Sequence, residues 1–282
     1  MRGVILACGV AAVVIAAVAA HAPHAQPLAG AAPRPQPLQS GSAFAPASVR
    51  ALEADEFANP GLLWVERGAK LWREAAGRDQ RSCASCHGDA AQSMRGAATR
   101  YPQLDAGRAR GADAASPQAA AAPQLINLEG RIRQCRSERQ RGEPLDHESD
   151  ALLALTAYVA HQSRGLPARH EIDPGLQPFF ERGRAFYNTR VGQLNLACTH
   201  CHDSNWGRLL GPETISQGHG NAYPAYRLEW QGLGSLHRRF RSCLSGVRAG
   251  MFPYGAPQYL ELELYLSWRG SGLPVESPGV RR

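Results

Sequence analysis

Two short runs of the chain each combine two cysteines with one histidine at identical spacing. The first reads Cys83-Ala84-Ser85-Cys86-His87, and the second reads Cys198-Thr199-His200-Cys201-His202. In a run of this kind the two thiols bond to the vinyl groups of one haem, and the histidine that follows them binds the iron. Two copies therefore predict two covalently bound haem c groups. The expected attachment residues are Cys83, Cys86, Cys198 and Cys201, and the expected proximal iron ligands are His87 and His202.

Two spare cysteines, Cys135 and Cys243, are expected to bind the opposite faces of the two irons. They follow the histidine of their own run by 48 and 41 residues. Small cytochromes c supply their second axial ligand at about this separation, and that ligand is usually a methionine. Met251 is an alternative for the second iron, but the first half has no counterpart to it. A Cys135–Cys243 disulfide is the other alternative, because spare thiols pair in an oxidising compartment.

An arginine stands four residues before each spare cysteine, Arg131 in the first half and Arg239 in the second. If these segments are helical, each guanidinium lies one turn away from its thiol. A nearby positive charge keeps a thiol deprotonated, and a thiolate ligand lowers the potential of a haem compared with methionine. The alternative for each arginine is an ordinary solvated side chain.

The two halves of the chain begin alike. Glu66-Arg67-Gly68 and Glu181-Arg182-Gly183 both end fifteen residues before the first cysteine of their haem run. Apolar residues recur at helical spacing around both triplets, over residues 62–72 and 179–187. This spacing predicts an amphipathic helix that leads into each haem run.

The halves also end alike. Apolar residues line one face over residues 152–159 and again over residues 260–266. Each segment is followed by a Gly-Leu-Pro sequence that ends at Pro167 or Pro274, nine residues after the matching tyrosine of its helix. Small cytochromes c pack an N-terminal helix against a C-terminal one with haem between them. We therefore predict an all-α fold of two tandem class I-like cytochrome c domains related by an internal repeat.

The N-terminus has the pattern of a secretory signal peptide. A short basic start precedes an apolar stretch at residues 4–20, and small residues then offer cleavage between 20 and 25. Removal of this segment removes Cys8, places the protein in the periplasm and leaves no membrane span. The expected organisation is a signal peptide at 1–25, a flexible leader at 26–49, a first cytochrome c domain at 50–165, a linker at 166–173, a second domain at 174–276 and a loose tail at 277–282.

The chain is basic, with a formal net charge of +7. It contains no nucleic-acid-binding motif, so this charge favours an anionic substrate or an acidic protein partner. Histidines outside the two runs, such as His161, His219 and His237, are expected at the surface and not on iron.

Together these features resemble the SoxA family of dihaem cytochrome subunits, which act in bacterial thiosulfate oxidation. The resemblance covers residues 50–276. Its most specific parts are the run Arg239-Phe240-Arg241-Ser242-Cys243 and the run from Trp268 to Pro274. The paired haem runs agree with the family but occur in other cytochromes as well.

The resemblance implies an enzyme, an L-cysteine S-thiosulfotransferase. Such a protein pairs with a SoxX-like monohaem cytochrome and joins thiosulfate to a cysteine of a SoxYZ-like carrier. Two electrons leave through haem to an acceptor cytochrome. The resemblance further implies that Cys243 is a catalytic axial ligand modified to a persulfide and that Arg239 binds substrate. A second substrate arginine is implied later in the chain, where Arg248 and Arg269 are both candidates.

Two other functions are compatible with the haem runs. A pure electron-transfer cytochrome would use both haems and carry out no chemistry of its own. A dihaem peroxidase would need one iron with an open coordination position, and a distal cysteine in both halves argues against it.

Overall fold

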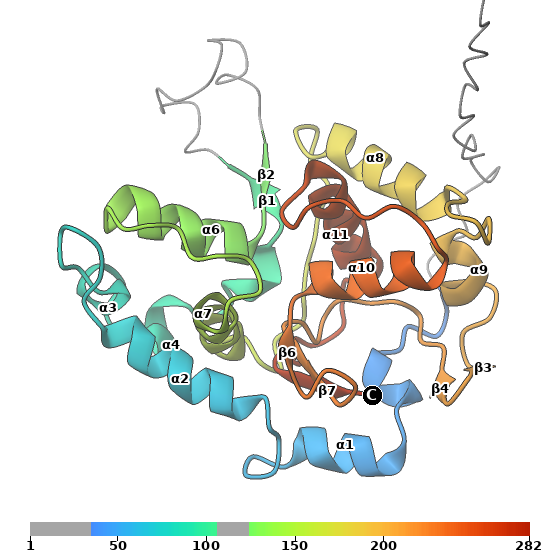
Figure 1. Ribbon diagram of the computed structural model, residues 1–282, viewed down its shortest axis with the longest axis horizontal. Coiled ribbons are helices and arrows are strands. Elements are labelled where there is room, and N and C mark those ends of the chain that lie inside the picture. The colour runs from blue at the N-terminus through green and yellow to red at the C-terminus, as the bar shows by residue number, and fades with distance from the viewer. Residues whose placement is uncertain (1–34, 106–123) are drawn as a thin grey trace, which may run out of the picture.

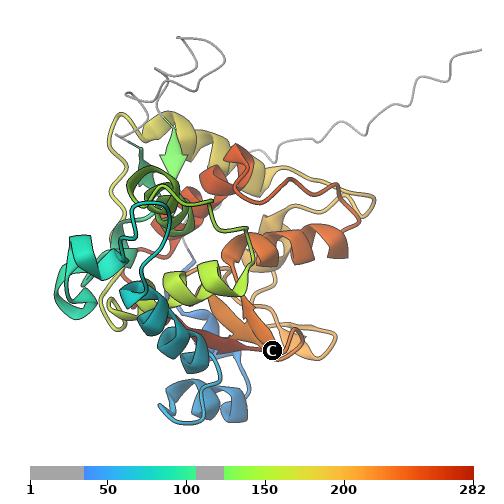
Figure 2. The same ribbon diagram turned by 60° about the vertical axis from the view of Figure 1, so that its left-hand side comes forward.

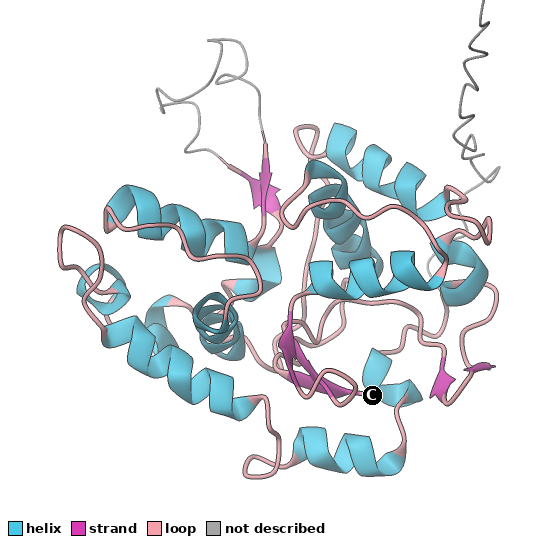
Figure 3. Cartoon of the chain, viewed as in Figure 1, coloured by secondary structure: helices cyan, strands magenta, loops and turns pink. Residues whose placement is uncertain are grey.

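The computed structural model describes residues 35–105 and 124–282, where helices predominate and strands are short (Figures 1 and 3). In chain order the elements are η1 (Gly41–Phe44), α1 (Ala47–Ala54), α2 (Leu62–Arg73), α3 (Cys83–His87), α4 (Ala90–Ser93), η2 (Ala98–Arg100), β1 (Gln103–Leu104), β2 (Leu125–Ile126), α6 (Leu128–Gln134), the π-helical η4 (Cys135–Arg139), α7 (Asp150–His161), α8 (Gln177–Asn188), α9 (Cys198–His202), β3 (Leu209–Leu210), β4 (Glu213–Thr214), β5 (Ala225–Arg227), β6 (Gly232–Gly234), α10 (Leu236–Gly246), α11 (Pro257–Arg269) and β7 (Gly279–Arg281).

In the first half, α2 and α7 pack at very short range because a glycine lies at their contact. A Cβ atom on Gly68 would lie only 2.1 Å from the carbonyl oxygen of Ala154 and 2.5 Å from the Cβ of Tyr158. Helix α7 is buried over almost its whole length, because α2 covers one side of it while α6 and β6 contact others. An apolar residue on every face suits a helix in that position.

In the second half, α8 and α11 make the equivalent close contact. A Cβ atom on Gly183 would lie 2.0 Å from the carbonyl oxygen of Glu261 and 3.1 Å from the Cβ of Tyr265. Gly68 and Gly183 occupy the same place in the two Glu-Arg-Gly triplets. Each triplet therefore ends at a helix crossing that admits no side chain.

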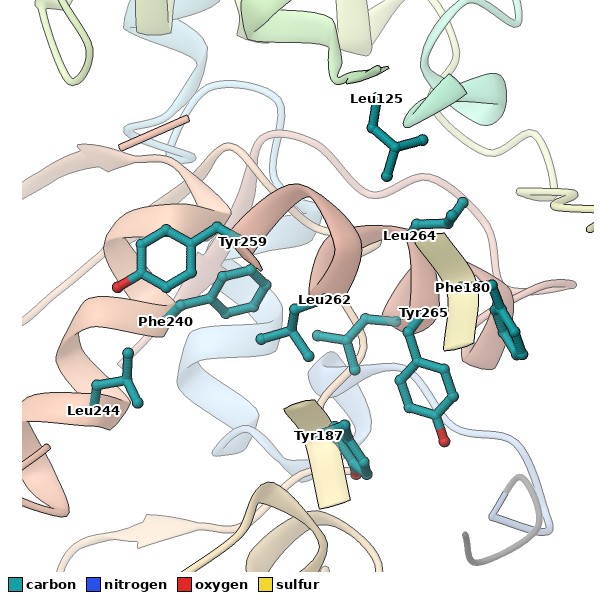
Figure 4. Close-up of a cluster of buried hydrophobic side chains, with 10 residues drawn as sticks. Leu125, Phe180, Tyr187, Phe240, Leu244, Tyr259, Leu262, Leu264 and Tyr265 are labelled. Atoms are coloured by element: carbon teal, nitrogen blue, oxygen red, sulfur yellow. The ribbon is translucent and has the colours of Figure 1, made fainter. Parts of the chain in front are cut away.

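The largest apolar cluster lies around α8, α10 and α11, as Figure 4 shows. Tyr187, Tyr259 and Tyr265 are its largest members, and each is at most 1% exposed. Tyr187 and Tyr265 lie with ring centroids 5.2 Å apart, within the range of favourable aromatic contacts. This cluster fixes the helix that carries Cys243 to the helix pair beside the second haem run.

Over residues 35–105 and 124–282, three small sheets accompany the helices, so the prediction of an all-α fold is incomplete. Two are antiparallel pairs, β1 with β2 and β3 with β4. In the third, β5 lies between β6 and β7 and pairs antiparallel with β6 and parallel with β7. The fold is therefore helix-rich, with short paired strands in addition.

The expectation of a loose C-terminal tail is wrong. Residues 279–281 form β7, and Val280 is fully buried. The Val280 backbone N–H donates to Glu53 Oε2 at 2.7 Å, and Arg281 forms an ion pair with the same carboxylate. Figures 1 and 2 show the C-terminus beside α1, far from it in sequence. Pairing with β5 satisfies backbone groups that a loose tail would leave to water.

The expected flexible leader is also shorter than predicted, because residues 35–49 are packed. The Gln39 backbone N–H donates to Gln217 Oε1, and Gln217 Nε2 donates to the Pro37 carbonyl, both at 2.8 Å. Val49 is 6% exposed. The predicted signal peptide lies outside the described residues. Among the helices within 35–105 and 124–282, none combines the length and apolar character that crossing a bilayer requires.

A cavity of about 100 Å³ lies between the two halves, and its lining includes Glu129, Glu263 and His237. Glu263 accepts hydrogen bonds there from Asn127 Nδ2 at 3.0 Å and His237 Nε2 at 3.1 Å. The Gly255 backbone N–H donates to His237 Nδ1, so the proton of this imidazole is on Nε2. His237 is 1% and His219 7% exposed, so the prediction that they lie at the surface is wrong.

Glu129 lines the same cavity and is 7% exposed. Burial first, and then the charges of Glu263 and Glu148, raise its pKa well above the usual value of 4.5. The folded protein therefore keeps a proton that the unfolded chain releases. This contribution to stability is complete below about pH 4.5 and is lost as the pH rises through the raised pKa, by about 1.4 kcal/mol per pH unit.

We expect Glu129→Gln to remove that loss, because the amide cannot ionise. As the pH rises above about 4.5, the Tm of the wild type should fall more than that of the variant. Thermal unfolding followed by circular dichroism measures both. Parallel pH profiles of the two proteins would contradict the assignment.

Candidate haem and active site

His202 is held in one orientation by the loop that follows α9. Its Nδ1 lies 2.8 Å from the Ser216 carbonyl oxygen. A carbonyl can only accept, so Nδ1 carries the proton and Nε2 is left as the ligand atom. Metal-binding histidines are commonly fixed through this second nitrogen, which sets both the tautomer and the ring plane.

Gly218 packs directly against the His202 ring. Its φ is +77°, and a Cβ atom there would lie 2.8 Å from His202 Cγ. The glycine is needed both for its left-handed backbone and for the close approach of the loop to the imidazole. The loop thus leaves little room for the ring to turn away.

We expect Gly218→Ala to displace the His202 ring and disturb iron binding, while the haem stays attached through its thioethers. The absorption and electron paramagnetic resonance spectra of the purified protein would report the change. Gly88→Ala is the matched control, since Gly88 also has a positive φ of +64° but no atom within 4 Å of the added Cβ. Equal changes from the wild-type spectra in the two variants would show that backbone strain, and not contact with the His202 ring, causes the effect.

Cys243 faces His202 from α10. Ser235 caps this helix by accepting a hydrogen bond from the Arg238 backbone N–H at 3.1 Å. The helix extends through Cys243 and places Arg239 one turn before it, as the spacing predicted. Electrostatic and hydrogen-bonding contact joins the Cys243 thiol to the His202 imidazole. The structure therefore brings the two expected axial ligands of the second haem together.

The environment of Cys243 favours a thiolate. The thiol touches solvent, yet enough protein surrounds it that burial is the largest influence and by itself would raise its pKa. The Arg239 guanidinium opposes burial most strongly, followed by His202 and Arg227, and the resulting pKa is about 7. The thiolate is the form that binds metals and acts as a nucleophile.

The first haem run has its own imidazole support. The Trp72 ring lies 5.7 Å from the His87 ring, and Trp72 Nε1 donates to the Gly88 carbonyl at 3.0 Å. Cys135 lies where α6 passes into η4 and interacts electrostatically with the thiols of Cys83 and Cys86. The spare cysteine of this half is thus also brought to its haem run.

The two spare cysteines differ in electrostatics. Burial raises the pKa of Cys135 above its usual value, even though Arg131 acts against it. Arg131 is occupied elsewhere, because its guanidinium pairs with Asp105 at 3.1 Å and donates to Gln134. For Arg239, by contrast, the Cys243 thiolate is the strongest influence and raises the arginine's pKa. The equivalent arginines therefore have different partners: Arg131 pairs with the Asp105 carboxylate, whereas Arg239 stabilises the Cys243 thiolate.

These residues suit haem c. All six cysteines within the described residues are free, so the Cys135–Cys243 disulfide is not formed. Burial first, and then Cys243, raises the pKa of the Cys198 thiol to about 12, which fits a thiol that forms a thioether and not a thiolate ligand. Each haem run thus has two free thiols, an adjacent imidazole and a second sulfur nearby.

The other ligand and substrate candidates lie apart from this arrangement. Met251 is 48% exposed in the loop after α10. Arg248 is exposed two residues beyond the end of that helix, with a φ of +56°. Arg269 is fully buried, pairs with Asp203 at 2.6 Å and stacks over the Tyr187 ring at 4.7 Å. Arg269 is therefore held away from solvent by Asp203, the residue that follows His202 in the sequence.

The sequence interpretation missed Arg227, which is 4% exposed on β5 and acts on the Cys243 thiolate. Its Nε donates to Glu229 Oε1 at 2.8 Å. The sequence shows only that Arg227 and Glu229 stand two residues apart, and the structure places Glu229 in the turn that follows β5. Nothing in that local pattern says that the pair lies beside Cys243.

Comparisons with known proteins agree on one family. The family description "SoxA/TsdA, cytochrome c domain" matches residues 67–168. "L-cysteine S-thiosulfotransferase subunit SoxA" of Pseudaminobacter salicylatoxidans is 43% identical over 256 residues, which cover 89% of this chain and 85% of that protein. The protein of the same name from Rhodovulum sulfidophilum is 35% identical and covers 86% and 80%.

A solved structure agrees with these relatives. The "Crystal structure of SoxXA from P. pantotrophus" matches with a TM-score of 0.79 and 34% sequence identity, over 87% of each chain. The chain belongs to the SoxA family. The predicted family and enzyme class are thereby confirmed. A cytochrome c domain also implies covalently bound haem c.

Proposed function

We propose that this protein is the dihaem catalytic subunit that conjugates thiosulfate to a cysteine of a SoxYZ-like carrier. Thiosulfate and the carrier thiol give a cysteine S-thiosulfonate, one proton and two electrons. A sulfur–sulfur bond forms and the thiol S–H bond breaks. The names and extents of the relatives support this activity.

The haem groups are assigned from the thiols and imidazoles that the fold gathers. Haem c supplies a one-electron acceptor at each site when bound. Cys83 and Cys86 would hold haem 1, with His87 and Cys135 as its iron ligands. Cys198 and Cys201 would hold haem 2, with His202 and Cys243 as its iron ligands.

The contrast between Cys243 and Cys135 is the observation that carries the proposal. Cys243 has a lowered pKa and an arginine that serves it, whereas burial raises the pKa of Cys135 and Arg131 pairs with Asp105. Only the second half therefore offers a stabilised thiolate beside a guanidinium. We place catalysis at haem 2 and assign haem 1 to relay or structural support.

The chain's own residues account for binding of the anion. Thiosulfate carries two negative charges, and the planar fork of Arg239 matches its sulfonate-type oxygens without losing its own proton. Arg248, exposed beyond α10, is our candidate for a second contact, because Arg269 is buried in an ion pair. Cys243 carries a persulfide in this proposal. Its outer sulfur would bond to the terminal sulfur of thiosulfate, with one proton released and two electrons passed to the acceptor cytochrome. The carrier thiol would then attack that former thiosulfate sulfur, which forms the S-thiosulfonate and releases the Cys243 persulfide.

The remaining assignments concern organisation and location. Matched helix crossings at Gly68 and Gly183 support two cytochrome c domains, at residues 50–165 and 174–276, joined by a linker at 166–173. The N-terminal pattern supports export to the periplasm. The SoxXA neighbour supports a SoxX-like monohaem subunit as partner. The carrier and an acceptor cytochrome complete the reaction.

Turnover with purified components tests the function. The assay combines the protein and its monohaem partner with thiosulfate, the carrier and an oxidised cytochrome. Mass spectrometry then measures the mass of the carrier. A carrier heavier by one thiosulfonate group, formed with two electrons delivered to the cytochrome, supports the proposal. Electron transfer with no change in carrier mass would instead favour a pure electron-transfer cytochrome.

The persulfide has its own test. Mass analysis of the peptide that contains Cys243 should show one additional sulfur, which a reductant removes. The peptide that contains Cys135 serves as the internal control and should show none.

A further inference from the structure

A cluster of four charged side chains adjoins Cys243, and Arg227 is its most buried member. The Arg227 side chain is 5% exposed, and its Nη2 lies 3.3 Å from Glu213 Oε1. Its Nε donates to Glu229 Oε1 at 2.8 Å. The guanidinium also lies over the Trp230 ring at 5.2 Å. Arg227 is therefore fixed on three sides by groups from β4 and from the turn after β5.

The same carboxylates reach toward Arg239. Glu229 Oε1 lies 4.0 Å from Arg239 Nη1, so one oxygen serves both guanidinium groups. After Cys243, the charges of Glu213 and Glu229 are among those that raise the pKa of Arg239. The site thus contains two arginines and two glutamates next to one thiolate.

This composition is unusual for a site that receives a dianion. Two carboxylates repel the incoming anion, and each competes with it for the Arg239 fork. Arg227 is too deeply buried to contact a substrate in solution, but it pairs with both carboxylates. The pairing neutralises them and holds Glu229 at the edge of Arg239.

We propose that Arg227 is a positioning residue of the anion site: by binding Glu213 and Glu229 it keeps the Arg239 guanidinium available to a divalent oxyanion of sulfur. This inference rests on the proposed function for the identity of the anion. It assigns Glu229 as the intermediary, because Glu229 is the carboxylate paired with both arginines.

The test measures thiosulfate binding by calorimetry and turnover separately, in the complete complex. Arg227→Gln should weaken thiosulfate binding about tenfold, because the partly exposed carboxylates beside Arg239 lose the buried counterion that neutralises them and then repel the anion. It should raise KM for thiosulfate more than it lowers kcat. The double variant Arg227→Gln with Glu229→Gln should recover most of the affinity, since the carboxylate that is paired with Arg239 is then neutral. A merely structural arginine would show no such recovery.

Arg238→Gln is the matched control. Arg238 lies over the same Trp230 ring at 4.3 Å, but it is 3.9 Å from Glu148 and is paired with neither Glu213 nor Glu229. Its loss should leave thiosulfate affinity unchanged. Circular dichroism and the haem spectrum establish that each variant is folded.

Each outcome decides the inference. Unchanged affinity in Arg227→Gln, or no recovery in the double variant, would overturn it while leaving the proposed function intact. A wild-type complex that binds thiosulfate but forms no thiosulfonate would overturn the proposed function, and the affinities would still decide the role of Arg227. A wild type that binds no thiosulfate would overturn both.

Discussion

A Cys243→Met variant is expected to keep its haem and to lose thiosulfate conjugation by at least about a thousandfold, the scale seen when a reacting nucleophile is removed. Methionine is a competent haem ligand, so the second iron should remain six-coordinate and its potential should rise. The substitution therefore separates ligation from sulfur chemistry. Turnover assays and a redox titration of the same preparation measure the two effects.

Cys135→Met provides the comparison within the same chain. It makes the same ligand exchange at the first haem, where the pKa of the cysteine is raised and its arginine is engaged by Asp105. We expect its potential to shift but its turnover to fall far less. If the two variants lost activity equally, catalysis would not be confined to haem 2, and if Cys243→Met kept its activity, the sulfur of Cys243 would have no catalytic role.

Local patterns predicted those parts of the site that lie within single elements. The spacing of Arg239 and Cys243 places them one turn apart because α10 extends through both. The two Glu-Arg-Gly triplets predicted matched helices, and Gly68 and Gly183 prove to lie at the closest crossing points. In these cases backbone periodicity alone decides which side chains share a face.

Features that depend on distant parts of the chain were not predictable. The tail contains few apolar residues, yet Val280 is buried because β5 and Glu53 supply partners for its backbone. Burial of Glu129 and His237 follows from the meeting of the two halves at one cavity. The type of a residue indicates its polarity but not whether it is buried. Polar residues such as Glu129 and His237 are therefore expected at the surface until the fold is known.

The same limit explains Arg227. Its pairing with Glu213 and its effect on Cys243 require β4, β5 and α10 to converge, and no local pattern contains that information. Sequence separation therefore divides the site into two parts. The expected iron ligands and Arg239 can be predicted from short motifs. The tertiary structure, in contrast, brings Arg227 to Cys243, where its charge lowers the pKa of the thiol.

Arg239→Lys should weaken thiosulfate binding about tenfold, although the charge at this position is retained. A lysine cannot present two parallel N–H groups to the oxygens of one sulfonate group. Arg239→Gln should weaken thiosulfate binding about a hundredfold or more, because the anion loses its cation and the Cys243 thiolate loses its strongest counterion. Calorimetric titration with thiosulfate gives the order of the three affinities.

The first half again supplies the control, because Arg131 stands in the same position relative to Cys135. Arg131 pairs with Asp105, so Arg131→Lys should leave thiosulfate affinity unchanged and alter only stability. Equal affinities for wild type and Arg239→Lys would show that point charge suffices and that the fork is not used. A loss of affinity in both variants would show instead that anion binding is not confined to the second half. Only the combination of a loss at Arg239 and none at Arg131 assigns anion recognition to the single site where a guanidinium serves a thiolate.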